Sequence, residues 1–387
     1  MKNFLLLLLV NLIFVFAYAE PASGNTKKED GERVPFTYET GNTSLKFGGF
    51  VRFVTFADYK GTVPSYDFIN STMSNEWDKL SRLSMDASAT RLNMKVVQKT
   101  DLLGKVEFFV EMDFRGASDV LRLRHAYLSF KGFTFGQTWS NMVDLAANAP
   151  TIDVQGVNSR TFYRVPLIGY KSNFTDKVSM GISFEFPKVK MTTSAQVGSV
   201  NQRFPDIPLY LMLKGERAHL KVTGLLRAMD YGDNPTQKIK TMYGIGGQVS
   251  GSLNFCNRVT LMGQGIYGKG IARYINDLAA LNLDLIYNDS DNTVHALPMF
   301  GVSVAARANF NKSLYATSSF SVASLTNKKE YYSDNEFFRG NYFSASLFWI
   351  GVKNLTIAGE FIHGRRINMN SIEKSANRIQ LMFMYSW

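Results

Sequence analysis

The last residues of the chain have one face that is apolar without interruption, while the other face is mixed, with Ser386, Met384, Met382, Gln380 and Arg378. Counting back by twos from the final residue gives an unbroken apolar row: Trp387, Tyr385, Phe383, Leu381 and Ile379. A period of two is typical of a β-strand with one apolar face. Because three aromatic residues share that face, the pattern favours a lipid-facing strand over a terminal strand of a soluble β-sandwich.

The first residues have the composition of a secretory signal peptide. A basic start at Lys2 is followed by an apolar run from Phe4 to Ala17, and the small residues Ala17 and Ala19 frame a cleavage site. This order predicts removal of residues 1–19. The single cysteine, Cys256, lies far from that site, which argues against a lipoprotein anchor and excludes an intramolecular disulfide.

Composition narrows the class of protein further. After the leader, no run of about 20 apolar residues occurs, which excludes helical membrane spans, yet hydrophobic residues make up 45% and aromatic residues 13% of the chain. Apolar residues placed at alternate positions explain both observations. The formal charge of +11 allows an anionic partner, but no lysine or arginine block suggests nucleic acid. A large secreted all-β protein is the alternative to a membrane barrel.

The chain divides into a polar lead-in and a long alternating region. Residues 20–45 are polar and lack a period, which predicts a flexible periplasmic segment, whereas residues 46–387 are predicted to form the barrel. Short turns join strands at one end and long loops at the other, the arrangement of an outer-membrane barrel. About 16 antiparallel strands are expected, at residues 45–58, 88–99, 104–114, 121–130, 133–139, 163–173, 177–186, 207–214, 218–229, 239–251, 258–268, 299–310, 313–325, 338–350, 354–366 and 375–387.

Several segments carry charge on a face that a soluble core would not accept. In segment 104–114, Val106, Phe108 and Val110 oppose Glu107 and Glu111. Charged residues on one face and apolar residues on the other suit a barrel with a polar interior in lipid.

The segment 121–130 breaks this alternation. Arg122 and Arg124 share a face with Leu128 and Phe130. A β-bulge near His125 would restore the pattern. Alternatively, the two arginines lie at a depth where both faces are polar, and the sequence leaves both interpretations open.

Ordered motifs resemble the DcaP-like family of trimeric outer-membrane porins. They run from about residue 46 to 387 and comprise LRLRHAY (121–127), GQTWSN (136–141), RFPDI (203–207), GLLR (224–227), GIARYIND (270–277), ALP (296–298), VKN (352–354), GRR (364–366) and ANR (376–378). The resemblance implies a homotrimer of 16-stranded barrels, each with a third extracellular loop folded into the lumen, that passes small anionic solutes. Residues 20–45 lack the heptads of an N-terminal coiled coil known in this family, so no periplasmic stalk is expected.

Arginines are the candidate solute contacts. A guanidinium group donates two parallel hydrogen bonds, which suits carboxylates and phosphates. Alternatively, inward arginines balance inward carboxylates or bind lipopolysaccharide phosphates near the rim. Arg122 and Arg227 rank highest because they lie mid-strand within motifs of the resemblance. The predicted pore-lining or anion-binding residues are Arg91, Arg122, Arg124, Arg160, Arg164, Arg227, Arg258, Arg307 and Arg366, with Arg378 also facing inward.

Other classes of site find little support. Four scattered histidines lack the spacing of metal ligands, and no serine nucleophile elbow suggests a hydrolase, so neither a metal, a cofactor nor catalytic residues are expected. The sequence therefore predicts a passive outer-membrane diffusion channel for small anions, in contact with outer-membrane lipids and lipopolysaccharide. A non-selective porin, a surface adhesin and, less favoured, an outer-membrane hydrolase are the alternatives.

Overall fold

The computed structural model describes residues 36–117, 120–326 and 329–387. The predicted signal peptide, residues 1–19, and residues 20–35 of the predicted lead-in lie outside the described residues. Within the described part, no helix has the length and apolar character that crossing a membrane requires.

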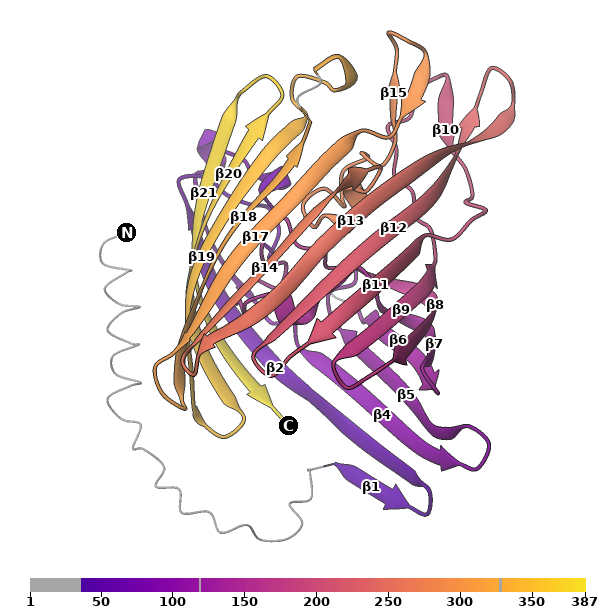
Figure 1. Cartoon of the computed structure of the whole chain (residues 1–387). Helices are drawn as coiled ribbons and strands as arrows, with labels where there is room; N and C mark the ends of the chain where they lie inside the picture. The colour runs from indigo at the N-terminus through magenta and orange to yellow at the C-terminus, as the bar shows by residue number, and fades with distance from the viewer. Residues whose placement is uncertain (1–35, 118–119, 327–328) are drawn as a thin grey trace.

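Sixteen antiparallel strands close into a barrel (Figure 1). The barrel closes where the first strand pairs with the last, with Phe53 opposite Phe383. The strand number and order agree with the alternation in the sequence. The strands are β2 (Thr43–Tyr59), β3 with β4 (Ser81–Asp86, Arg91–Thr100), β5 (Gly104–Asp113), β6 (Arg122–Phe130), β7 (Phe133–Trp139), β8 (Arg164–Asn173), β9 (Val178–Glu185), β11 (Ile207–Lys214), β12 (Ala218–Asp233), β13 (Lys238–Cys256), β14 (Val259–Lys269), β17 (Pro298–Asn309), β18 (Leu314–Leu325), β19 (Phe337–Val352), β20 (Leu355–Asn368) and β21 (Glu373–Ser386).

The second barrel strand is made of two pieces. Both β3 and β4 pair with β2, with Leu83 opposite Ala57 and Met94 opposite Phe47. The sequence analysis assigned residues 81–86 to a loop, because only Leu83 and Met85 mark the outward face of this short piece. Both side chains are about 60% exposed, at 59% and 60%, as a lipid-facing position requires.

Part of the predicted flexible lead-in is ordered. β1 (Thr37–Thr40) pairs with the start of β2, with Thr40 opposite Thr43. The two residues between them form a tight turn in which Gly41 has φ +50°, a conformation that glycine adopts without steric cost. The expectation of an unstructured segment up to residue 45 is therefore corrected for residues 37–45.

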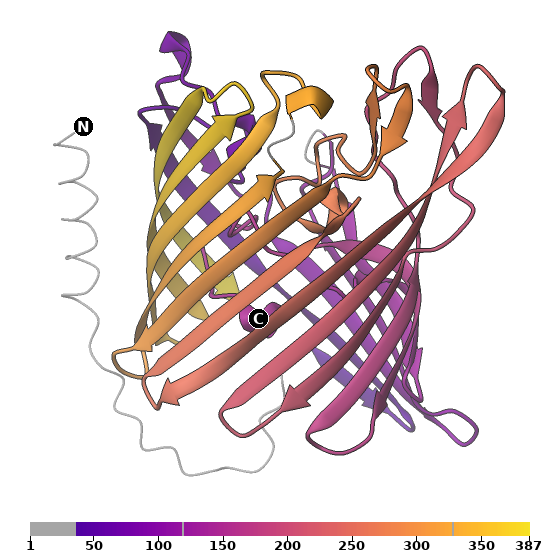
Figure 2. The ribbon, with the colours of Figure 1, turned by 45° about the horizontal axis from the view of Figure 1, so that its top comes forward.

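The two ends of the barrel differ in the length of their connections. Short turns and the β1 hairpin lie at one end, and the long loops lie at the other (Figures 1 and 2). The long connections carry the small strands β10 (Val197–Ser199), β15 (Ile286–Asn288) and β16 (Thr293–His295) and the one-turn 3₁₀ helices η1 (Asn70–Thr72), η2 (Trp77–Lys79), η4 (Leu145–Ala147), η5 (Ala272–Tyr274) and η6 (Lys329–Tyr331). This asymmetry is typical of outer-membrane barrels, whose long loops are extracellular.

Three long connections supply most of the buried loop residues. We call them loop 1 (residues 60–80), loop 3 (residues 140–163) and loop 6 (residues 270–297). In loop 6, Ile271, Ile275 and Leu278 are fully buried and pack with Leu225 of β12 and Ile266 of β14. An apolar core therefore fills part of the barrel interior beside these strands.

Candidate functional site

Side chains on β12 show how the barrel separates its two faces. Leu220, Val222 and Leu226 are 44%, 47% and 58% exposed, whereas Lys221 and Arg227, at the alternate positions, are 4% and 2% exposed. Alternate residues of a strand point to opposite faces. The outer surface is therefore apolar and the interior polar, as the alternation of charge predicted.

A group of arginines lies on the inner wall formed by β2 to β8. Cross-strand pairing places Arg91 of β4 opposite Asp113 of β5, and Asp113 opposite Arg122 of β6. Arg164 of β8 lies close enough to Arg91 and Arg122 to be repelled by their charges. Three of the predicted arginines are thus brought together on one wall.

A β-bulge on β6 brings a fourth arginine to the same wall. Glu111 pairs with His125 and Met112 pairs with Leu123, so Arg124 is the extra residue between them. This register decides between the two interpretations of the segment 121–130 in favour of the bulge. Arg122 and Arg124 can then both point inward, while Leu123 remains 49% exposed on the outer face.

Two of these arginines are neutralised by carboxylates. Arg122 donates from Nε and Nη2 to the two oxygens of Asp113, at 2.9 and 2.7 Å. Arg124, 1% exposed, donates to Glu111 at 2.6 Å and to Asp113 at 2.9 Å. Arg–carboxylate pairs with this geometry are strong and specific, and they leave these two guanidinium groups little capacity for a solute.

Three other arginines have no carboxylate at hydrogen-bond distance among the described residues. Arg164 packs over the ring of Trp139 at 4.5 Å, and its buried Nη1 has no hydrogen-bond partner. Arg91 approaches Glu111 only to 3.8 Å. Arg52 of β2 donates to the carbonyl oxygen of Ile152 and to the sulfur of Met382. These groups retain positive charge that an anion can satisfy.

A cavity of about 390 Å³ lies between Arg52 and Arg91 of the wall and loop 3. Arg52 and Arg91 form its charged side, and Arg160 of loop 3 also lines it. Phe348, Met382 and other apolar side chains face the arginines from β19, β21 and neighbouring strands. The cavity therefore combines guanidinium groups with an apolar wall.

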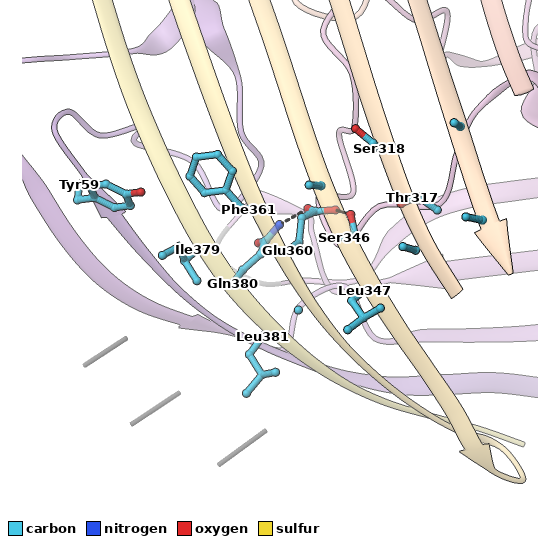
Figure 3. A pocket seen from close by; sticks show the side chains of 15 residues that line it. Tyr59, Thr317, Ser318, Ser346, Leu347, Glu360, Phe361, Ile379, Gln380 and Leu381 are labelled. Carbon is cyan, nitrogen blue, oxygen red and sulfur yellow. Dashed lines mark hydrogen bonds between the residues drawn. The ribbon is translucent and has the colours of Figure 1, made fainter. Parts of the chain in front are cut away.

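Hydrogen bonds attach loop 3 to inward side chains of β20. The carboxylate of Glu360 accepts the backbone N–H groups of Ile152 and Asp153, both at 2.9 Å. Ser346 and Gln380 also donate to this carboxylate, and Figure 3 shows both contacts. These four hydrogen bonds stabilise the buried carboxylate of Glu360, which is otherwise unpaired among the described residues.

The other end of loop 3 is attached to β12 and β13. Lys221 donates from Nζ to the carbonyl oxygens of Asn141 and Val143, both at 2.8 Å. The carboxylate of Asp144 lies 2.9 Å from Nε2 of His219 and accepts a hydrogen bond from Ser250. Contacts to both sides of the barrel fix the path of this loop.

The carboxyl group of Asp153 in loop 3 contacts both loop 1 and the barrel wall. It accepts hydrogen bonds from the backbone of Phe68 in loop 1 at 3.2 Å and from the hydroxyl of Tyr342 at 3.2 Å. Burial, together with the nearby charges of Asp67 and Glu360, raises the pKa of Asp153 to about 7.

The outer face of β17 to β21 has a hollow of about 780 Å³. Its walls include small residues such as Ala306, Ala345 and Gly359, with Phe361 and Leu381 beside them. This hollow is larger than the cavity at the arginines, and the outward side chains that line it are mostly small and apolar.

Comparison with known families supplies the identity of the fold. A family model described as the DcaP outer membrane protein matches residues 26–387. The chain belongs to the DcaP outer membrane protein family. No match was found among curated protein sequences.

Solved structures share the barrel at low sequence identity. The crystal structure of the outer membrane channel DcaP of Acinetobacter baumannii is 19% identical with a TM-score of 0.78, covering 89% of this chain and 98% of that chain. An anion-selective porin from Comamonas acidovorans is 10% identical with a TM-score of 0.61, covering 89% and 100%. A trimer form of OmpT of Vibrio cholerae is 13% identical with a TM-score of 0.56, covering 90% and 100%. Together with the family match, these structures establish a channel fold of the DcaP family.

The remaining predicted arginines are scattered over other parts of this DcaP-family barrel. Arg227 is buried and donates to Asp206 at 3.1 Å and Asp284 at 2.7 Å. Arg258 was predicted to face inward from a strand, but it is exposed in the two-residue turn between β13 and β14. The correction follows from the length of β13, which extends to Cys256 and moves the turn along the chain.

Three more arginines contact protein groups. Arg307 lies over the ring of Tyr315 at 3.8 Å. Arg366 donates to the backbone oxygens of Ser71 and Asn335 and so joins loop 1 to the connection before β19. The buried Arg378 donates to both oxygens of Asp58, at 2.6 and 3.0 Å. Each has a structural partner within the described residues.

Arg52 is the wall residue that the sequence analysis missed. It lies between Val51 and Phe53, which are 55% and 40% exposed on the outer face. The same alternation that identified Arg91 therefore marks Arg52 as inward. Its position near the closure of the barrel, opposite Met384, is visible only when the first and last strands are paired.

Proposed function

We propose that this protein is a passive outer-membrane porin that admits small anions, including carboxylates and phosphate-like anions, into the periplasm. The observation that supports this proposal is the charge on the wall of β2 to β8, where Arg52, Arg91 and Arg164 lack a carboxylate at hydrogen-bond distance. A solute that passes between this wall and loop 3 meets positive charge that carboxylates offset only in part, with Glu111 3.8 Å from Arg91, and the sign of the pore lining determines ion preference. One of the similar solved structures, from Comamonas acidovorans, is named an anion-selective porin. That name is consistent with the proposal.

The proposal assigns different roles to the predicted arginines. Arg91 and Arg164, with Arg52, contact solutes, whereas Arg122 and Arg124 shape the wall through Asp113. Arg160 supports loop 3 at the cavity. Arg227, Arg307 and Arg366 act as structural anchors, and Arg258 contacts the aqueous phase at the short-turn end.

The proposal also covers the setting of the barrel. After cleavage behind Ala19, the protein forms a homotrimer in contact with outer-membrane lipids and lipopolysaccharide, and it requires neither a cofactor nor a metal. A trimer form exists for the similar OmpT structure. Loop 3 narrows the lumen, and its attachment at Glu360 and Lys221 supports that position.

The reversal potential of the purified protein in a planar bilayer under a salt gradient tests the proposal. We expect the sign that indicates anion preference. The opposite sign would show a preference for cations and contradict the proposed anion channel. A zero potential would favour a general porin. Absence of any conductance would reject the diffusion-channel function.

The anion preference is also expected to depend on pH through Asp153. Its raised pKa means that the carboxyl is largely neutral at about pH 5.5 and charged at about pH 8.5. Ionisation adds negative charge close to the cavity at Arg52 and Arg160, so anion preference should fall as pH rises through about 7. Because the folded pKa is above the ordinary value, the stability of the loop 3 attachment should also fall as pH rises from about 4 to about 7.

Asp153→Asn provides the control for this pH effect. The amide keeps an acceptor for the N–H of Phe68 but does not ionise. Its reversal potential should stay near the acidic wild-type value across the range. An equal pH dependence in wild type and Asp153→Asn would assign the effect to another group.

A further inference from the structure

Loops 1, 3 and 6 are joined by direct hydrogen bonds inside the barrel. The backbone N–H of Asn70 in loop 1 donates to Oδ2 of Asp277 in loop 6 at 3.0 Å. The backbone N–H of Asp277 donates to the carbonyl oxygen of Asn158 in loop 3 at 3.0 Å, and that of Asn276 donates to the carbonyl oxygen of Arg160 at 3.1 Å. Asp277 therefore connects all three loops.

The carboxyl group of Asp277 is fully buried. Burial raises its pKa well above the ordinary range. Its Oδ1 atom has no hydrogen-bond partner among the described residues. Asp277 therefore connects the loops through one carboxyl oxygen, which accepts the N–H of Asn70, and through its own backbone N–H, which donates to Asn158.

The barrel wall has glycines where these loops touch it. A Cβ atom at Gly364 of β20 would lie 2.4 Å from Cε1 of Phe68 and 2.5 Å from Oδ1 of Asn70. At Gly340 of β19 it would lie 2.8 Å from Nδ2 of Asn158. These distances are shorter than van der Waals contact, so a larger residue would require the facing side chains of loops 1 and 3 to shift.

A third glycine supports loop 3 from β17. A Cβ atom at Gly301 would lie 2.7 Å from the backbone oxygen of Ser159, and Ser159 donates to the carbonyl oxygen of Val302 at 2.8 Å. Backbone atoms cannot move aside as the end of a side chain can. We call Gly301, Gly340 and Gly364 the glycine seat.

Apolar packing holds loop 1 and loop 3 against the same region of the wall. Phe68 and Met73 of loop 1 and Val157 of loop 3 form one buried cluster with Tyr342 of β19 and Ile362 of β20. The rings of Phe68 and Tyr342 meet edge to face at 6.0 Å, a favourable geometry. Packing and hydrogen bonds therefore make the three loops one connected body.

We propose that loops 1 and 6 are positioning elements of the pore, which hold loop 3 at a fixed distance from the arginine wall through the glycine seat and Asp277. The inference rests on the proposed function and extends it, because it assigns pore width to three loops together. Residues 148–154 of loop 3 line the cavity at Arg52 and Arg91, and the same stretch is bonded to loop 1 at Asp153. A shift of the seat is therefore transmitted to the cavity.

Gly364→Ala tests the seat, and Gly359→Ala is the matched control. Both glycines lie on β20, but a Cβ atom at Gly359 would meet nothing within 4 Å. Pore conductance depends on width at the constriction, so we expect Gly364→Ala to lower single-channel conductance by about twofold and to increase its fluctuations. Gly359→Ala should conduct as wild type. Equal conductance for all three proteins would overturn the inference.

Asp277 provides a second test that does not alter the wall. Asp277→Asn keeps an acceptor for the N–H of Asn70, whereas Asp277→Ala removes it. We expect unstable, fluctuating conductance in Asp277→Ala and steady wild-type conductance in Asp277→Asn. Steady conductance in Asp277→Ala would show that the side-chain bond between loops 1 and 6 does not help to position loop 3, even if Gly364→Ala fails to fold.

The outcomes separate this inference from the proposed function. Wild-type protein without anion preference would reject the proposed solute class, and the comparison of Gly364→Ala with Gly359→Ala would still test the role of the loops. Conversely, an anion-selective wild type with an unaffected Gly364→Ala variant would reject only the positioning role.

Discussion

Replacing Arg52, Arg91 and Arg164 together by glutamine is expected to remove most of the anion preference of the channel. None of the three guanidinium groups has a carboxylate within hydrogen-bond distance among the described residues. A unit charge ~7 Å from an ion in water contributes about 0.6 kcal/mol, which is roughly a threefold preference for each arginine. The measurement is the reversal potential under a salt gradient, compared with wild type at the same pH.

A control variant removes one positive charge outside the wall. Arg258→Gln changes an exposed residue in the turn between β13 and β14, where counterions screen its charge. It should leave the reversal potential unchanged. If Arg258→Gln altered selectivity as much as the triple variant, overall charge rather than the wall would determine ion preference.

A second comparison separates the uncompensated arginines from the paired ones. Arg122→Gln removes a guanidinium group that Asp113 neutralises through two hydrogen bonds. The variant leaves Asp113 with Arg124 as its remaining partner. We expect a smaller shift in reversal potential than for Arg164→Gln, although the sequence analysis ranked Arg122 above Arg164.

The alternation of the sequence was sufficient to predict the barrel. A strand in lipid must be apolar on its outer face, and this requirement repeats at every second residue within the barrel strands, from Phe47 in β2 to Tyr385 in β21. Where the outer face offered few residues, as at Leu83 and Met85 of β3, the prediction missed the strand. Where the alternation broke, only the pairing of Glu111 with His125 showed that Arg124 is a bulge residue.

The sequence did not predict which groups the inward residues contact. Arg52 and Arg227 have the same local pattern, an arginine between outward apolar residues. One faces the cavity and the other is buried in ion pairs, because Asp284 comes from loop 6, more than fifty residues along the chain from Arg227. Alternation gives the face of a residue, but the fold of the loops determines which inward residues remain accessible to a solute.

Arg227→Met is expected to destabilise the barrel strongly without reversing its ion preference. The buried guanidinium group bonds Asp206 and Asp284 and donates to the carbonyl oxygen of Gly270, and it lies 5.4 Å from the ring centre of Tyr274. Removing one partner of a buried ion pair leaves uncompensated charge, which costs about 3–5 kcal/mol. Urea-dependent unfolding of the detergent-solubilised barrel measures this change.

Neutralising the two carboxylates should restore much of the loss. Burial raises the pKa of Asp206 even beside Arg227, so its carboxylate depends on the guanidinium group. In the triple variant Arg227→Met, Asp206→Asn, Asp284→Asn, no buried charge from this group remains unpaired. Recovery of stability with an unchanged reversal potential would establish Arg227 as an anchor of loop 6. A large change in selectivity without loss of stability would instead make Arg227 a solute contact, because removal of a structural anchor lowers the free energy of unfolding.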